Sequence, residues 1–125
     1  DSIALVKNPI FGAGFESFWL GSRLEILWEK WWWKPNQAHN GYIETYLNLG
    51  AIGVLILIFL IISTFKKISK NLLVDFNYSY LRLGILFAIL FYNYSEAAFK
   101  GLGLVYAVFH IIAIDYPKRL SPRKN

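Results

Sequence analysis

The longest uncharged stretch limits what this chain can fold into. Residues 47–65 (LNLGAIGVLILIFLIISTF) contain no Asp, Glu, Lys or Arg. As an α-helix rising ~1.5 Å per residue, this stretch reaches nearly across the ~30 Å hydrocarbon core of a bilayer. It lies too deep in the chain for a signal peptide, and Lys66 and Lys67 follow it instead of a small-residue cleavage site. We therefore predict a transmembrane helix over residues 47–65.

Two further apolar stretches follow the first. They predict transmembrane helices over residues 83–99 and 101–116, which form a hairpin that turns around Lys100 and Gly101. Each stretch is short for a complete span, so a bent pair that re-enters the membrane is an open alternative. The predicted fold class is an all-α membrane protein with three transmembrane helices.

The distribution of charge predicts the orientation of these segments. Residues 66–82 and 115–125 contain eight Lys or Arg and two Asp, whereas the opposite side contains five basic and six acidic residues. Basic loops stay cytoplasmic. We therefore predict a cytoplasmic loop at 66–82, a cytoplasmic tail at 117–125 and an extracytoplasmic loop at 1–46. Topology explains the net charge of +5, so we expect no nucleic-acid partner.

The composition excludes several classes of protein. Hydrophobic residues make up 56% and charged residues 17% of the 125 residues, which argues against a disordered chain and against a small water-soluble domain. The absence of Cys excludes disulfides, thiolate nucleophiles and Cys-based zinc sites, and no cluster of metal ligands is visible. Met is also absent, even at position 1, so we expect the C-terminal part of a longer protein with further transmembrane helices.

An amphipathic helix is predicted within the extracytoplasmic loop. Ser22 and Glu25 have the spacing of a capping box, and residues 23–34 place apolar side chains at helical spacing. We expect this helix to lie flat on the outer leaflet, because indole rings favour the headgroup region. The same rings could instead line a glycan groove, since aromatic rings stack on sugars. The tryptophans concerned are Trp28, Trp31, Trp32 and Trp33.

His39 is the candidate catalytic residue. It lies shortly before the first predicted span, and a neutral imidazole there can accept a proton from a hydroxyl group. A helix-capping or hydrogen-bonding role is the alternative. Glu44 follows five residues later and would be rotated away from His39 on a helix, so no His39–Glu44 dyad is predicted.

Two ionisable residues accompany the later apolar stretches. Glu96 is predicted at the outer end, paired along a helix with Lys100 four residues later. His110 is predicted within the third span, where a hydrogen bond to a neighbouring helix would satisfy its imidazole.

Two motifs in a fixed order connect these observations. The first is NPIFGAGFESF, with Pro9, Gly12 and Gly14, and the second is AHNGYIETYLNLGAIG, which leads into the first span. In the second motif the matching positions are His39, Asn40, Gly50 and Gly53. Over about residues 5–65, this arrangement resembles the conserved domain of the O-antigen ligase and polymerase family.

The resemblance implies a metal-independent glycosyltransferase of the bacterial cytoplasmic membrane, with no cofactor. Such an enzyme joins a glycan carried on undecaprenyl diphosphate to a hydroxyl group of a glycan, lipid or protein acceptor outside the membrane. His39 and Asn40 take the catalytic positions of the motif, with His39 on the extracytoplasmic side. A non-catalytic multi-pass membrane module and a fragment of a glycan transporter or flippase are the alternatives.

Substrate-binding roles are expected for further residues of the extracytoplasmic loop. Arg23 is the only arginine on that side, and a guanidinium group binds phosphate oxygens bidentately. Lys34 could assist Arg23 in binding the diphosphate as a point charge. Glu16 could contact a sugar hydroxyl. Gly12 and Gly14 are expected to bind substrate as well, because they belong to the first motif.

Overall fold

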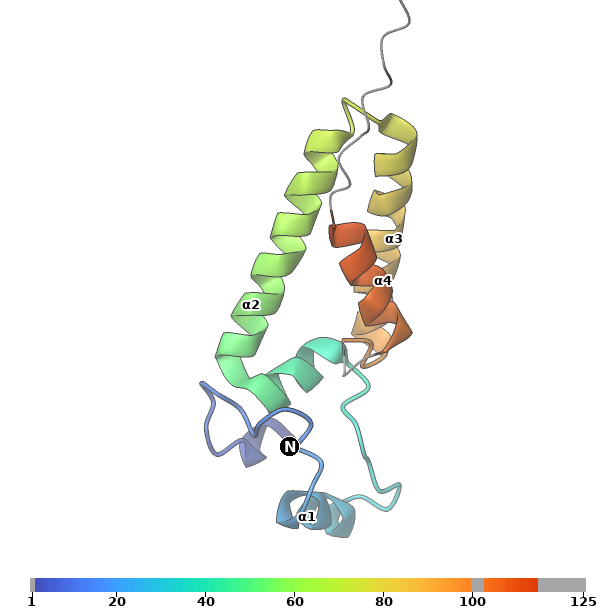
Figure 1. Cartoon of the computed structure of the whole chain (residues 1–125). Coiled ribbons are helices and arrows are strands. Elements are labelled where there is room, and N and C mark those ends of the chain that lie inside the picture. Colours follow the sequence, from blue (N-terminus) through green and yellow to red (C-terminus); the bar gives the residue numbers. More distant parts are fainter. Residues whose placement is uncertain (1, 100–102, 115–125) are drawn as a thin grey trace, which may run out of the picture.

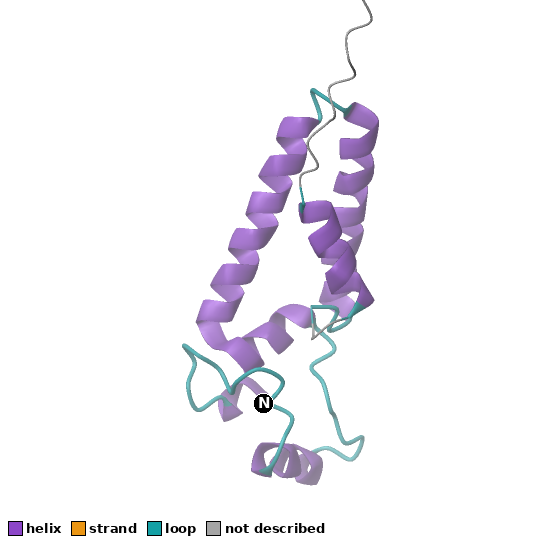
Figure 2. Cartoon of the chain, in the orientation of Figure 1, coloured by secondary structure: helices purple, strands orange, loops and turns teal. Residues whose placement is uncertain are grey.

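The computed structural model describes residues 2–99 and 103–114 (Figure 1). Every regular element in these ranges is helical, which confirms the all-α prediction for the described part of the chain. Figure 2 shows long loops on both sides of the first α-helix, whereas the next two helices are joined by a short turn. The elements are η1 (Ser2–Leu5), α1 (Ser22–Lys30), α2 (Gly41–Asn71), α3 (Phe76–Ser95) and α4 (Leu104–Ala113).

Helix α2 has the length and the apolar composition of a membrane-spanning helix. Among the described residues it is the one helix that is both long and apolar enough to cross a membrane, with a mean hydropathy of 2.5 over its best window. It extends beyond the predicted span of 47–65 at both ends, and Lys66, Lys67 and Lys70 lie in its last turns. One membrane-length helix is therefore confirmed.

Helix α2 is broken at Gly50, where φ is 65° and ψ is −161°. The first limb, residues 41–49, lies across one end of the helix bundle, between the bundle and α1, and the long limb, residues 51–71, leads away from it (Figure 1). At ~1.5 Å per residue the long limb measures ~30 Å, which is the thickness of the hydrocarbon core.

Backbone amides of the first motif, NPIFGAGFESF, replace the hydrogen-bond donors that the break at Gly50 removes. In a continuous helix the carbonyls of Leu47 and Asn48 would accept hydrogen bonds from the amides four residues later. Here Ala13 N–H donates to the Leu47 carbonyl at 3.0 Å, and Gly14 N–H donates to the Asn48 carbonyl at 2.8 Å. Both carbonyls thus keep a partner.

The same loop also supplies the missing acceptors. Ala51 N–H donates to the Pro9 carbonyl at 2.9 Å, and Ile52 N–H donates to the Ile10 carbonyl at 3.2 Å. Unpaired backbone groups are costly where water is excluded, so a break in this helix needs such partners. The loop and the kink are one structural unit.

Glycine is required on both sides of this contact. A Cβ atom on Gly12, whose φ is 72°, would lie 2.5 Å from the Gly50 backbone nitrogen. A Cβ atom on Gly50 would in turn meet the Ile10 carbonyl and the Gly12 nitrogen. The two backbones therefore approach more closely than any side chain permits.

Helices α3 and α4 differ from the predicted hairpin. Helix α3 begins at Phe76 instead of Leu83 and ends at Ser95, so most of the predicted loop at 66–82 is helical. Helix α4 has 10 residues and measures ~15 Å, about half of a span. Three transmembrane helices are therefore not confirmed. The ends of the predicted span at 101–116 and the tail at 117–125 lie outside the described residues.

Arg82 is the last residue of the predicted loop at 66–82, but the structure places it on α3 and buries it within the bundle. Its Nε and Nη2 atoms donate to the Ile112 carbonyl at 2.9 and 2.6 Å, and Nη2 also donates to the Ile114 carbonyl at 3.2 Å. These carbonyls belong to the C-terminal end of α4, where backbone acceptors lack helical partners and the helix dipole favours a cation. Arg82 therefore caps α4 from α3.

Two apolar clusters hold the described elements together. One lies among α2, α3 and α4 and includes Ile68, Leu86 and Phe109. The other contains Phe18, Trp19, Leu27 and Leu47, and it packs α1 and the loops around it against the short limb of α2. Much of the predicted extracytoplasmic loop at 1–46 is thus a small folded unit.

Candidate functional site

Asn40 ties the start of α2 to the end of α3. Its Oδ1 atom accepts hydrogen bonds from the amides of Tyr42 and Ile43 at 3.0 and 3.1 Å, as an N-cap residue does. Its Nδ2 atom donates to the Tyr94 carbonyl at 2.9 Å, and the Tyr42 hydroxyl donates to the Leu90 carbonyl at 3.2 Å. These contacts fix the backbone that carries His39.

Gly41 allows the two helices to meet at this point. A Cβ atom there would collide with the side chain of Asn93, which is fully buried on α3. Asn93 Oδ1 accepts a hydrogen bond from Phe99 N–H at 3.0 Å, so the same side chain holds the segment that follows α3.

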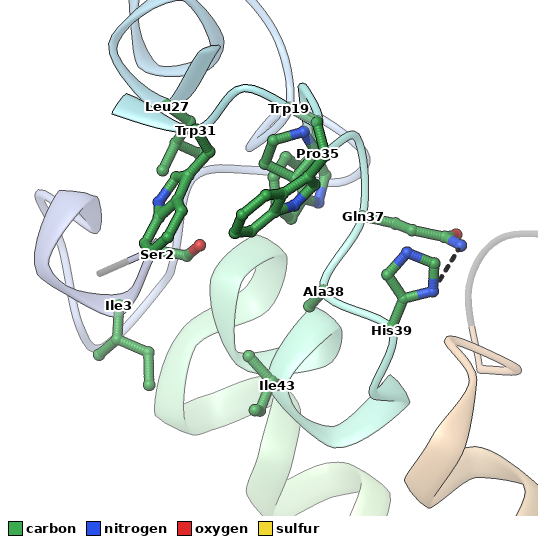
Figure 3. A pocket seen from close by; sticks show the side chains of 11 residues that line it. Ser2, Ile3, Trp19, Leu27, Trp31, Pro35, Gln37, Ala38, His39 and Ile43 are labelled. Atoms are coloured by element: carbon green, nitrogen blue, oxygen red, sulfur yellow. Dashed lines mark hydrogen bonds between the residues drawn. The ribbon is translucent and has the colours of Figure 1, made fainter. Parts of the chain in front are cut away.

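His39 lies on the surface of this junction. Its side chain is 65% exposed, and its backbone has φ of 49°, in the left-handed region. Nδ1 lies 3.2 Å from Nε2 of Gln37 and 3.8 Å from Oε2 of Glu96 (Figure 3 shows the contact with Gln37). The carboxylate that approaches His39 is therefore Glu96, which follows α3, and not Glu44.

A cavity of about 360 Å³ adjoins His39. Its walls include Trp19, Trp31, Trp33 and Pro35, and His39 and Gln37 lie together at one side (Figure 3). This volume is within the usual range for small-molecule sites, about 300–1,000 Å³.

Glu44 is a buried structural residue. One carboxylate oxygen accepts from Trp19 Nε1 at 2.8 Å and from Asn48 Nδ2 at 3.0 Å, and the other accepts from Ala38 N–H at 3.0 Å. Asn48 Oδ1 in turn accepts from Phe18 N–H at 3.2 Å. This network fixes one wall of the cavity and the backbone just before His39.

The residues predicted to bind substrate do not line this cavity. Arg23 donates to the carbonyls of Ser17 and Phe18 at 3.0 and 3.4 Å, so its guanidinium group supports the loop. The Gly14 amide donates to the Asn48 carbonyl next to the kink in α2. The amide of Gly12 donates to the Asn8 carbonyl at 2.7 Å, so neither glycine N–H is free for a ligand.

Glu16 and Lys34 are exposed loop residues with positive φ, at 51° and 47°. Lys34 Nζ lies 5.6 Å from the centre of the Trp28 ring, at cation–π distance. The structure brings neither side chain to the cavity beside His39, and their substrate-binding roles stay predictions.

The amphipathic helix differs from the sequence prediction at both ends. Gly21, not Ser22, is the N-cap residue of α1, and no side chain caps the helix, so the predicted capping box is absent. The helix ends at Lys30 instead of continuing to Lys34. Trp31 therefore follows the helix, where it packs on the cluster around Leu27 and faces the cavity.

The remaining ionisable residues also have different partners. His110 Nδ1 donates to the Tyr106 carbonyl at 2.8 Å within α4 itself, and not to a neighbouring helix. Glu96 has extended backbone after the end of α3, so it cannot pair with Lys100 along a helix as predicted. Lys100 lies outside the described residues.

Sequence reasoning missed Gln37, the contact of Glu96 with His39 and the buried network around Glu44. Asn48 gave one signal, since a polar residue within the predicted span must find a partner. No sequence signal joined Glu96 to His39. In the described ranges, no group of three or more His, Asp or Glu side chains could hold a metal ion.

No protein-family model, curated protein or solved structure matches this chain. The geometry around His39 is therefore the evidence for function.

Proposed function

We propose that this chain is the C-terminal part of a membrane glycosyltransferase that resembles O-antigen ligases and polymerases. Its donor is a polyprenyl-diphosphate-linked glycan, and its acceptor is a hydroxyl group of a glycan, lipid or protein. The reaction takes place outside the bacterial cytoplasmic membrane, without a metal or cofactor. His39 is the catalytic residue, and Asn40 fixes its position.

The observation that carries the proposal is the setting of His39. An imidazole that is 65% exposed lies beside a cavity and near a carboxylate, at the start of a membrane-length helix. The basic residues Lys66, Lys67 and Lys70 lie at the opposite end of that helix. Because basic ends stay cytoplasmic, this asymmetry favours an extracytoplasmic position for His39.

The proposed reaction is a direct displacement at the anomeric carbon. The imidazole of His39 takes the proton of the acceptor hydroxyl as its oxygen attacks. A new C–O bond forms, the bond from the anomeric carbon to the diphosphate oxygen breaks, and the lipid diphosphate leaves with the electron pair. A diphosphate leaves readily, so alignment of the attacking oxygen is the main task of the protein.

Glu96 is the positioning residue in this scheme. For Nε2 of His39 to act as the base, the hydrogen of the neutral ring must be on Nδ1. Nδ1 faces the Glu96 carboxylate at 3.8 Å, and a small approach would let Nδ1–H donate to it. Gln37 can also serve this tautomer if its amide group is turned so that the oxygen faces Nδ1.

The test is His39→Ala in the full-length protein, expressed in cells that assemble the glycan. Loss of a general base should lower glycan transfer by at least about 100-fold, with the protein still inserted at its normal level. His110→Ala is the matched control, because it removes an exposed imidazole on α4 away from the site. Unchanged glycan product in His39→Ala at normal protein level would reject the proposal.

A second candidate is a non-catalytic membrane module, which the capping role of Asn40 favours. Both ends of its amide group are engaged in joining α2 to α3. In such a module, His39→Ala would change stability or nothing, and it would leave glycan transfer intact.

A further inference from the structure

The cavity beside His39 has a fixed aromatic wall. Trp19 is almost fully buried, and its indole N–H is bonded to Glu44 at 2.8 Å. Trp31 and Trp33 lie with ring centres 4.5 Å apart. The indole Nε1–H of Trp28 donates to the Pro35 carbonyl at 3.0 Å, and this hydrogen bond holds the segment that places Pro35 in the wall. A ligand would therefore meet aromatic faces that are already in place.

The charge of the cavity indicates the kind of ligand. Its described lining contains no Asp, Glu, Lys or Arg. A diphosphate would need cations here, and Arg23, Lys30 and Lys34 are all outside the lining. The cavity therefore suits a neutral ligand better than the charged part of the donor.

The polar groups of the cavity are at its edge. Gln37 and His39 lie side by side there, and Ser2 is a further polar residue of the lining (Figure 3). Aromatic faces with hydrogen-bonding groups at the rim match a pyranose ring, which has apolar C–H faces and hydroxyl groups around its edge.

From this match we infer that the cavity binds a neutral sugar ring of the acceptor glycan, stacked against Trp33 and Trp31. This inference rests on the proposed function, in which an acceptor hydroxyl must reach His39. A ring held against the tryptophans would occupy a cavity whose lining also includes His39, so the cavity would be a subsite that aligns the acceptor.

The test uses the full-length wild-type protein in lipid nanodiscs, with the methyl glycosides of glucose, galactose and N-acetylglucosamine as probes. Saturation-transfer NMR should detect transfer from the protein to the ring C–H protons of at least one glycoside. Trp33→Ala should weaken binding of that glycoside by about five- to tenfold, because one stacked ring is lost. Trp33→Phe should restore most of the affinity.

Trp32→Ala is the matched control. Trp32 is 88% exposed and does not line the cavity, so this variant should bind the glycoside as the wild type does. Trp33 is 54% exposed, which makes it a safer choice than Trp31, whose ring also packs on the apolar cluster.

Three results would overturn the inference. The first is the absence of saturation transfer to all three glycosides at millimolar concentration, and the second is an equal loss of binding in Trp32→Ala and Trp33→Ala. The third is occupation by lipid, in which brominated phosphatidylcholine quenches tryptophan fluorescence more in the wild type than in Trp33→Ala and no glycoside relieves the quenching.

The subsite and the proposed function can fail separately. If a glycoside binds as expected but His39→Ala transfers glycan normally, the subsite stands and the catalytic role falls. If no glycoside binds but His39→Ala abolishes transfer, the catalytic role stands and the subsite falls.

Discussion

At the scale of single residues, buried and exposed carboxylates have different tasks in this protein. Glu44 is 3% exposed and accepts hydrogen bonds from Trp19, Asn48 and Ala38. Glu96 is 46% exposed, with His39 as its neighbour. Burial with three donors marks a structural role, whereas exposure beside an imidazole leaves Glu96 available for chemistry.

We expect Glu44→Gln to lower the free energy of unfolding by about 1–3 kcal/mol. The amide group replaces one accepting oxygen with a donor, and that donor then faces another N–H group in a buried site. Unfolding monitored by tryptophan fluorescence measures the effect. Glu25→Gln, at an exposed position on α1, should change stability by less than about 0.5 kcal/mol. Equal effects of the two variants would contradict this assignment.

We expect Glu96→Gln to lower glycan transfer by roughly tenfold or more without a loss of stability, because in the proposed scheme the Glu96 carboxylate would hold the hydrogen of His39 on Nδ1. Nitrogen-15 NMR of the His39 ring measures the tautomer directly. The fraction with hydrogen on Nδ1 should fall in Glu96→Gln and be unaffected in Glu25→Gln. An unchanged tautomer with reduced transfer would assign Glu96 a different role.

At the scale of elements, the break in α2 is built by two distant segments. The loop at 9–14 gives four backbone hydrogen bonds to the residues on either side of Gly50. Asn40 caps the short limb and holds the junction with α3, and Glu44 on the short limb holds the wall of the cavity. The position of the candidate site therefore depends on the kink.

We expect Gly12→Ala to cost about 2 kcal/mol more stability than Gly21→Ala. Both positions have positive φ, at 72° and 64°, but only at Gly12 would the new Cβ meet backbone atoms. The difference isolates the contact between the loop and the kink. Hydrogen exchange should also quicken at Ala51 and Ile52, whose acceptors are in the loop. Equal costs and unchanged exchange would contradict a role for this contact.

The elements were predictable where local pattern decides them. The charge-free run predicted the core of α2, and apolar spacing predicted a helix near α1. The ends were not predictable, because Lys66 marks the end of the apolar stretch and not the end of the helix, which continues to Asn71. The break at Gly50 was also missed, since the loop that satisfies its backbone groups lies about 40 residues earlier in the chain.

At the scale of the whole molecule, α2 separates two chemically different ends. One end has the cavity, His39 and Glu96, and the other has Lys66, Lys67 and Lys70. The sequence predicted this separation because it follows from charge and length along one segment. It did not predict the neighbours of His39, since the contact with Glu96 depends on how α3 packs against the start of α2.

The most direct test of this account is the side of the membrane on which each end of α2 lies. The chain has no cysteine, so Asn36→Cys and Lys67→Cys, both at exposed positions, give single labels at the two ends. In intact cells, a membrane-impermeant maleimide should label position 36 and should label position 67 only after lysis. Labelling of position 67 alone, or of both positions, would contradict an extracytoplasmic His39 and with it the proposed transfer.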